Sequence, residues 1–132
     1  MLAADHLQGY LTGSIDLVVR HGVDRHVVVD YKTNRSPSGR YDHTSLAAMM
    51  VHGNYPLQAA LYTVVLHRYL AQRLGATYVP DRHLGGSSYW FVRGMQGPST
   101  KAHEGHRDGV FSWRPSTGFI TALDALLAGR SR

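Results

Sequence analysis

Two aspartates and a lysine are spaced in a way that could support metal-dependent hydrolysis. Asp16 lies in a β-branched run that continues to Arg20, and a second run begins at His26 and contains Asp30 and Lys32. Glycine and aspartate between the two runs are turn formers, so the segment predicts a β-hairpin. If Arg20 pairs with His26, Asp16 lies directly opposite Asp30, and Lys32 points to the same face of the sheet.

Opposed carboxylates at this spacing, with Cβ atoms about 4.5–5.5 Å apart, repel each other unless a proton or a cation lies between them. A hard divalent ion such as Mg²⁺, or alternatively Mn²⁺, would fit between Asp16 and Asp30. Lys32 could then stabilise a developing negative charge or orient a water molecule. The alternative interpretation is an ordinary amphipathic hairpin with a solvated polar face.

The composition is that of one globular domain with a modest positive charge. The 132 residues are 43% hydrophobic and 17% charged, with a net charge of +5, which suits a single core and a polyanionic partner. The absence of cysteine excludes disulfides, Cys-ligated zinc and Cys-ligated iron–sulfur clusters. We find no apolar run long enough to span a bilayer and no signal peptide, so we expect a cytoplasmic protein without membrane contact.

Further strands and helices must position the hairpin. From the turn, capping and periodicity signals we expect a strand over 8–13, helices over 42–51, 56–74 and 115–129, a strand over 85–94 and a loop over 96–108. The apolar face expected for the 56–74 helix comprises Leu57, Leu61, Val64, Val65 and Leu74.

Gln58 and Tyr62 form a second candidate pair, because residues four apart lie on one face of the 56–74 helix. Gln-x-x-x-Tyr is common by itself, and the alternative is a partly exposed glutamine above a half-buried tyrosine. The aromatic run Tyr89–Phe91 could stack on bases, but we favour a core position because aromatic strand residues are more often buried.

Several basic residues are weaker candidates. Arg35, Arg40 and Arg93 could contact phosphate, although solvated arginines are equally consistent with the pattern. His103 and His106 have a spacing that zinc ligands use, but no second pair at a fitting interval supports a zinc site.

The hairpin motif, Gly-x-Ile-Asp followed by Asp-Tyr-Lys, resembles the core of the PD-(D/E)xK nuclease family. The Gln-x-x-x-Tyr helix resembles the RecB-type branch of that family, whose nuclease domains belong to bacterial exonuclease V helicase–nucleases. Similar blocks run in the same order from about residue 9 to residue 128, at 9–18, 29–34, 55–63, 66–70, 81–86 and 89–95.

This resemblance implies an α/β fold of the restriction-endonuclease type, a mixed central β-sheet flanked by helices. It implies that residues 1–132 form a single RecB-type nuclease domain, a C-terminal fragment of a larger helicase–nuclease. That enzyme would act in double-strand-break repair and recombination, on single strands from unwound DNA and with the other subunits of a RecBCD-type complex. ATP would be used only by other domains, because this chain has no Gly-x-x-x-x-Gly-Lys-Ser/Thr loop.

The resemblance assigns a metal-dependent hydrolysis to this site. Its catalytic residues would be Asp16, Asp30 and Lys32, and its Mg²⁺ ligands Asp16, Asp30 and the backbone carbonyl of Tyr31. Gln58 and Tyr62 would line the channel for the DNA strand, with Arg35 and Arg93 as further DNA contacts.

The sequence also departs from the family. We find no counterpart of the first core helix, which supplies a histidine ligand, so we expect weak metal binding and weak or absent nuclease activity from the isolated chain. Ser87 and Ser88 replace apolar residues, so we expect that strand to be less buried or less regular. A non-catalytic DNA-binding or subunit-docking module and a resolvase or restriction-type endonuclease are the alternative functions.

Overall fold

The computed structural model describes residues 15–95, 102–103 and 106–129. A four-stranded mixed sheet forms its centre, in the order β1-β2-β3-β6. The strands are β1 (Leu17–His21), β2 (Arg25–Lys32), β3 (Leu84–Phe91) and β6 (Val110–Trp113). β2 is antiparallel to β1 and parallel to β3, and β3 is antiparallel to β6. Together with flanking helices, this is the restriction-endonuclease-like α/β fold that was expected.

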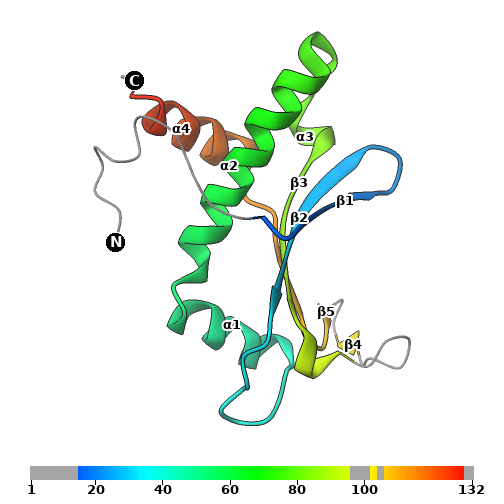
Figure 1. Ribbon diagram of the computed structural model, residues 1–132, viewed down its shortest axis with the longest axis vertical. Coiled ribbons are helices and arrows are strands. Elements are labelled where there is room, and N and C mark those ends of the chain that lie inside the picture. Colours follow the sequence, from blue (N-terminus) through cyan, green and yellow to red (C-terminus); the bar gives the residue numbers. More distant parts are fainter. Residues whose placement is uncertain (1–14, 96–101, 104–105, 130–132) are drawn as a thin grey trace.

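The helices are α1 (His43–His52), α2 (Tyr55–Leu74), α3 (Pro80–His83) and α4 (Thr117–Leu127), with short 3-10 turns at Gly75–Thr77 and Val92–Gly94. In Figure 1, α1, α2 and α4 lie on the same side of the sheet, and the long α2 runs alongside it. No helix in the described part of the chain has the length and apolar content needed to cross a membrane.

Local sequence explains where the helices begin and end. Pro56 occupies the first turn of α2, where a missing N–H costs nothing, and Gly75 with φ of 55° ends that helix. Ser116 caps α4, because its side chain accepts a hydrogen bond from the backbone N–H of Phe119. The predicted helices are therefore confirmed to within a few residues.

Two apolar clusters lie between the sheet and the helices. One joins α2, α4 and the sheet and consists of Val28, Val64, Leu66, Leu70, Leu84, Ile120 and Leu127. The other joins α1, α2 and β3 and consists of Leu46, Met50, Ala59, Tyr89 and Phe91. The predicted core position of the aromatic run holds for Tyr89 and Phe91, which are 1% and 0% exposed, whereas Trp90 is only partly buried.

The predicted apolar face of α2 was partly wrong. Leu57 is 45% exposed, whereas Ala59, Ala60 and Thr63 are buried. These small residues let α2 lie close against β3, and Thr63 Oγ1 is within hydrogen-bond distance of Ser87 Oγ at 2.9 Å. The buried face of α2 is therefore determined by its small side chains rather than by the spacing of its leucines.

The strand at Ser87 and Ser88 was expected to be less buried or less regular. It is buried there, so the first expectation was wrong, but its pairing with β2 is irregular just before Ser87. Both residues lie within β3 and are 2% and 6% exposed. Ser87 Oγ donates to the carbonyl of Ala59 at 3.2 Å, and Ser88 Oγ is paired with Ser112 Oγ at 2.9 Å. The hydroxyls can be buried because each has a hydrogen-bond partner.

A β-bulge interrupts β3 near its start. His26 pairs with Leu84 but Val28 pairs with Ser87, so β3 has one extra residue at Gly85–Gly86. Gly86 has φ of 90°, and a Cβ there would overlap the backbone carbonyl of Trp113. The bulge lets Leu84, Ser87 and the following odd-numbered residues all face the helices.

Other expectations have mixed outcomes. The hairpin loop is shorter than expected, because His21 pairs with Arg25. The predicted loop over 96–108 contains a small two-stranded sheet of β4 (Ala102–His103) and β5 (His106–Arg107). The expected strand over 8–13 and the expected lack of a preceding helix lie outside the described residues.

Candidate active site

The site is built on the end of β2. Asp30 and Lys32 are two residues apart in β2, so their side chains lie on the same face of the strand. Asp30 is only 5% exposed. Lys32 Nζ lies 2.8 Å from Asp30 Oδ2, in an ion pair without hydrogen-bond geometry. Among the described groups, this carboxylate oxygen accepts no hydrogen bond although it is buried. It can therefore accept a further cationic partner.

Two tyrosine rings hold the lysine in place. Lys32 Nζ lies 4.1 Å from the ring centroid of Tyr55 and 5.6 Å from that of Tyr89. The two rings stack on each other, with centroids 5.6 Å apart. A cation over aromatic faces is attracted to them, so the ammonium position is fixed by α2 and β3 as well as by its own strand.

Gln58 and Tyr62 of α2 extend this arrangement through Tyr89, which is the neighbour of Asp30 across β2 and β3. The Tyr89 hydroxyl donates to Gln58 Oε1 at 2.7 Å, and Gln58 Nε2 donates to the Tyr62 hydroxyl at 3.2 Å. Burial raises the pKa of Tyr89, and the negative charge of Asp30 raises that pKa further. The structure thus brings the helical pair to the face that carries the Asp30 carboxylate.

Asp16 lies just before β1. The five pairs of β1 with β2 have the predicted register and end at Leu17 opposite Val29, so continuing this register would set Asp16 opposite Asp30. Asp16 itself is not paired in the sheet. Its side-chain Oδ2 accepts a hydrogen bond from the Tyr31 backbone N–H at 2.9 Å.

The charged residues of the site affect the pKa of the Tyr62 hydroxyl. Burial raises the pKa of Tyr62, Asp30 and Asp16 raise it further, and Lys32 opposes them. The contacts described above bring Asp30, Lys32, Gln58 and Tyr62 to one side of the sheet. The hydrogen bond from the Tyr31 N–H places the Asp16 carboxylate beside the peptide that joins Asp30 to Tyr31.

The donor set suits a hard divalent cation and fills only part of its coordination shell. Two carboxylates and the carbonyl of Tyr31 are oxygen donors, and Mg²⁺ is usually held by one or two carboxylates together with water and substrate phosphate. Among the described residues, no group of three or more His, Asp or Glu side chains could hold a metal ion. The buried Asp30 oxygen without a hydrogen bond is a ligand that a divalent cation could take, with the remaining positions left to water and phosphate.

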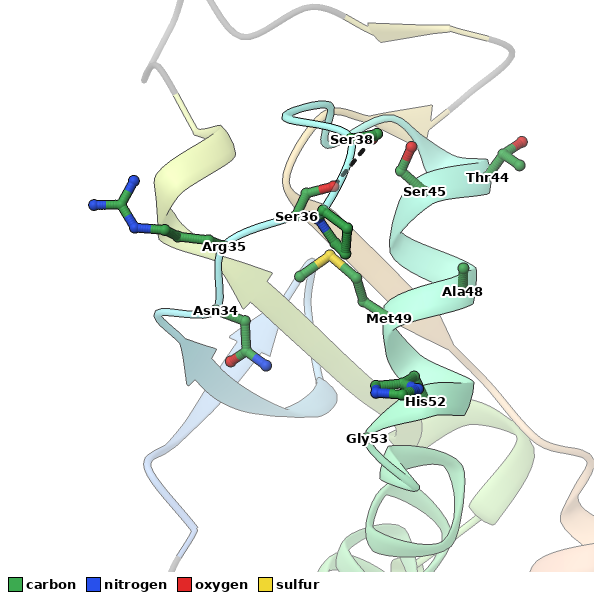
Figure 2. Close-up of a pocket in the computed structure, with 11 residues that line it drawn as sticks. Asn34, Arg35, Ser36, Ser38, Thr44, Ser45, Ala48, Met49, His52 and Gly53 are labelled. Atoms are coloured by element: carbon green, nitrogen blue, oxygen red, sulfur yellow. Dashed lines mark hydrogen bonds between the residues drawn. The ribbon is translucent and has the colours of Figure 1, made fainter.

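Arginines flank the same edge of the sheet. The exposed Arg93 side chain donates from Nε to the carbonyl of Thr33 at 2.7 Å, one residue beyond Lys32. Arg35 is exposed, and Figure 2 shows its side chain extending away from α1. Both guanidinium groups remain accessible at the end of β2, where the predicted DNA strand would pass.

Sequence reasoning did not single out Tyr55 as a site residue. It precedes Pro56 at the start of α2, and its position under Lys32 becomes evident only when the helix packs on the sheet. The proposed His103–His106 zinc pair lies partly outside the described side chains. His106 instead stacks on His43, with ring centroids 3.8 Å apart.

Comparison with known proteins supports the interpretation of this site as that of a nuclease. The chain is 51% identical over 123 residues to the RecBCD enzyme subunit RecB of Mycobacterium tuberculosis, covering 92% of this chain and 11% of the relative. It is 48% identical over 134 residues to that of Mycolicibacterium smegmatis, covering 96% and 12%. It is 40% identical over 125 residues to that of Escherichia coli, covering 93% and 10%.

The chain thus spans about a tenth of the length of these relatives. A family model of the PD-(D/E)XK nuclease superfamily matches residues 2–118, a range that includes Asp16, Asp30, Lys32 and the Gln58–Tyr62 pair. The chain belongs to the PD-(D/E)XK nuclease superfamily.

Proposed function

We propose that this chain is a Mg²⁺-dependent deoxyribonuclease domain that hydrolyses phosphodiester bonds in single strands of unwound DNA. The RecB relatives support placing it in a RecBCD-type helicase–nuclease that acts in double-strand-break repair and recombination. Duplex unwinding and ATP use would belong to other parts of that assembly. The contact between Asp30 and Lys32 beneath the Gln58–Tyr62–Tyr89 network is the observation on which the proposal mainly rests.

Asp16, Asp30 and the carbonyl of Tyr31 would hold the metal ion, with Mn²⁺ as an alternative to Mg²⁺. Such an ion polarises the phosphate and lowers the pKa of a bound water. Lys32 would donate to a phosphate oxygen as negative charge develops on it, or orient the attacking water. Because Tyr55 and Tyr89 already fix the ammonium, little reorganisation is required during the reaction.

Gln58 and Tyr62 would position the strand. Tyrosine hydroxyls are protonated at neutral pH, and the pKa of Tyr62 is raised further by burial, so its hydroxyl can donate a hydrogen bond to a phosphate oxygen. Arg35 and Arg93 would contact neighbouring phosphates in a way that does not depend on base sequence.

The direct test is degradation of linear single-stranded DNA in Mg²⁺ or Mn²⁺, by the chain alone, where we expect slow cleavage at most, and by the chain with the other subunits of a RecBCD-type complex. Asp16→Asn, Asp30→Asn and Lys32→Met should each lower the rate about 10²–10³-fold, the usual loss when one preorganised electrostatic group is removed. Asp24→Asn is the matched control, because Asp24 lies at the turn of the same hairpin and pairs with Arg82. A rate that survives Asp30→Asn would exclude this assignment.

A non-catalytic DNA-binding or docking module is the alternative. It would bind DNA in either metal without cutting it, even when the other subunits of a RecBCD-type complex are supplied. Comparing linear with circular single strands separates an exonuclease from a resolvase or restriction-type enzyme, because only an exonuclease requires a free end.

A further inference from the structure

A cavity of about 600 Å³ lies beside the candidate active site, between residues 34–38 and α1. We refer to it as the loop–α1 cavity. In Figure 2, Met49 and His52 extend from α1 toward the loop. Its volume is in the range of pockets that bind small organic molecules, about 300–1,000 Å³.

The loop wall of this cavity is held in shape by its own hydrogen bonds. The Ser36 backbone N–H donates to the Tyr41 hydroxyl at 3.1 Å, and the Gly39 N–H donates to the Ser36 carbonyl at 2.9 Å. Ser36 Oγ and Ser38 Oγ are 3.2 Å apart and hydrogen-bonded. A wall that is already ordered reduces the entropy cost of binding.

The lining combines an apolar surface with hydrogen-bonding groups, and it includes the cationic Arg35. Met49, Pro37 and Ala48 offer methyl, methylene and thioether surface, and Ser45 and Asn34 offer donors and acceptors. Within the part of the chain that the structure describes, no carboxylate lines the cavity. The apolar surface suits a planar heterocycle, and the donors and acceptors suit its polar edges. The lack of carboxylates among the described lining residues means that an anion attached to the heterocycle would not be repelled.

The cavity connects to the candidate active site through Tyr55. Asn34 Nδ2 donates to the Tyr55 hydroxyl at 3.3 Å, while Lys32 Nζ lies over the ring of the same tyrosine. Lys32 and Asn34 are two residues apart, so their Cα atoms are separated by at most about 7 Å. The cavity and Lys32 are therefore close enough to contact neighbouring parts of one strand.

We infer that the loop–α1 cavity binds one unstacked nucleotide of the DNA strand, next to the phosphodiester that lies at Lys32. This inference rests on the proposed function, because the active site supplies the attached phosphate. The base inserts against Met49 and hydrogen-bonds through its edge to the hydroxyl and amide groups. A duplex does not present its bases in this way, so the cavity favours single strands.

Methyl NMR of the 132-residue chain tests the inference without requiring catalysis. The four methionines are labelled with ¹³C at the methyl group, and tetrathymidylate is titrated in EDTA. The Met49 signal should shift saturably, while the signal of Met50, which is 2% exposed in the core, stays in place. An abasic tetranucleotide with the same phosphates should leave Met49 unmoved. Equal shifts of Met49 and Met50, or a shift with the abasic strand, would refute a base in the cavity.

Ala48→Phe fills the cavity, and Val51→Phe is its matched control on α1, because Val51 is 73% exposed and does not line the cavity. Ala48→Phe should abolish the Met49 shift and weaken oligonucleotide binding at least tenfold, whereas Val51→Phe should change neither. A duplex of thymidine and adenosine that shifts Met49 as strongly as the single strand would overturn the specificity for single strands.

The cleavage assay tests the proposed function independently of the nucleotide site. Asp30→Asn should lower cleavage about 10²–10³-fold and keep the Met49 shift. If the wild-type chain shifts Met49 but does not cut DNA under any metal, even when the other subunits of a RecBCD-type complex are supplied, the proposed function fails and the nucleotide site stands. If the chain cuts DNA while Met49 remains unmoved, the nucleotide site fails and the proposed function stands.

Discussion

The ammonium group of Lys32 stands over the ring of Tyr55, with Nζ 4.1 Å from the ring centroid. The first turn of α2 therefore fixes a group that β2 provides. In the proposed reaction Tyr55 would be a positioning residue, because its ring contacts the lysine. Removing the ring should affect the reaction through the freedom that it gives to the lysine.

Tyr55→Leu is expected to lower kcat by about twofold to thirtyfold, the range of a cation–π interaction of about 0.5–2 kcal/mol. Tyr55→Phe keeps the ring and loses only the hydrogen bond from Asn34, so its kcat should stay near the wild-type value. The measurement is steady-state cleavage of a single-stranded substrate, with kcat and KM determined separately. Equal losses in kcat for both variants would show that the ring does not act on Lys32.

Metal binding by the chain should be weak. Asp16 and Asp30 are the carboxylates that the described structure brings to the site, and most of the coordination shell is left to water. Calorimetric titration with Mg²⁺ and Mn²⁺ should give a Kd above the micromolar range, and Asp30→Ala should remove the remaining heat. Micromolar binding that disappears in Asp30→Ala would contradict this prediction.

Gly86→Ala should strongly destabilise the fold. Gly86 has a positive φ, and the new Cβ would overlap the Trp113 carbonyl on the neighbouring strand. Strain of this type costs about 1–3 kcal/mol before the overlap is relieved, so we expect the free energy of unfolding to fall by at least about 2 kcal/mol. Gly118→Ala in α4 is the control, because nothing lies within 4 Å of the position that its new Cβ would take, and it should be neutral or stabilising. Urea denaturation of the two variants measures the difference.

Acid should lower the free energy of unfolding through His67, a partly buried residue of α2 that lies beside Asp124 of α4. Burial lowers the pKa of His67 below its ordinary value of 6.5, the charge of Asp124 opposes this shift, and Arg68 adds to it. The unfolded chain therefore takes up this proton at a higher pH than the folded chain. The His67 contribution to stability is present above about pH 6.5 and is lost as the pH falls through the folded pKa.

The unfolding free energy of the wild-type chain should thus fall between pH 7 and pH 5, and it should fall less in His67→Gln. His67 Nδ1 is 2.7 Å from the Tyr78 hydroxyl, which glutamine can also reach. His21→Gln at the exposed hairpin end is the control and should keep the wild-type slope. An unchanged slope in His67→Gln would exclude His67 as the group responsible.

The hairpin register and the shared face of Asp30 and Lys32 could be predicted from the sequence. Both depend on local rules, since side chains alternate along a strand and turn residues fix the pairing. The convergence of Gln58 with Tyr62 also follows from a local rule, the four-residue spacing on a helix. The roles of these residues in catalysis and DNA binding remain predictions.

The position of Tyr55 beneath Lys32 and the burial of Ser87 could not be predicted in this way. Each depends on how closely α2 approaches β3, which is set by small residues such as Ala59 and Thr63 and by hydrogen bonds between elements distant in sequence. The helix expected over 115–129 likewise buries only part of its apolar surface, because Phe119 and Leu126 are 47% and 67% exposed. A periodic pattern identifies an amphipathic helix but not the width of the surface it covers.

The bulge at Gly85–Gly86 shifts the side-chain alternation of β3 by one residue. Leu84, before the bulge, packs in the cluster shared with α4, and Tyr89, after it, lies beside Asp30. A regular strand of the same residues would place Trp90, rather than Tyr89, on the face that carries Leu84. The bulge therefore determines which residues reach the candidate active site as directly as the residue types do.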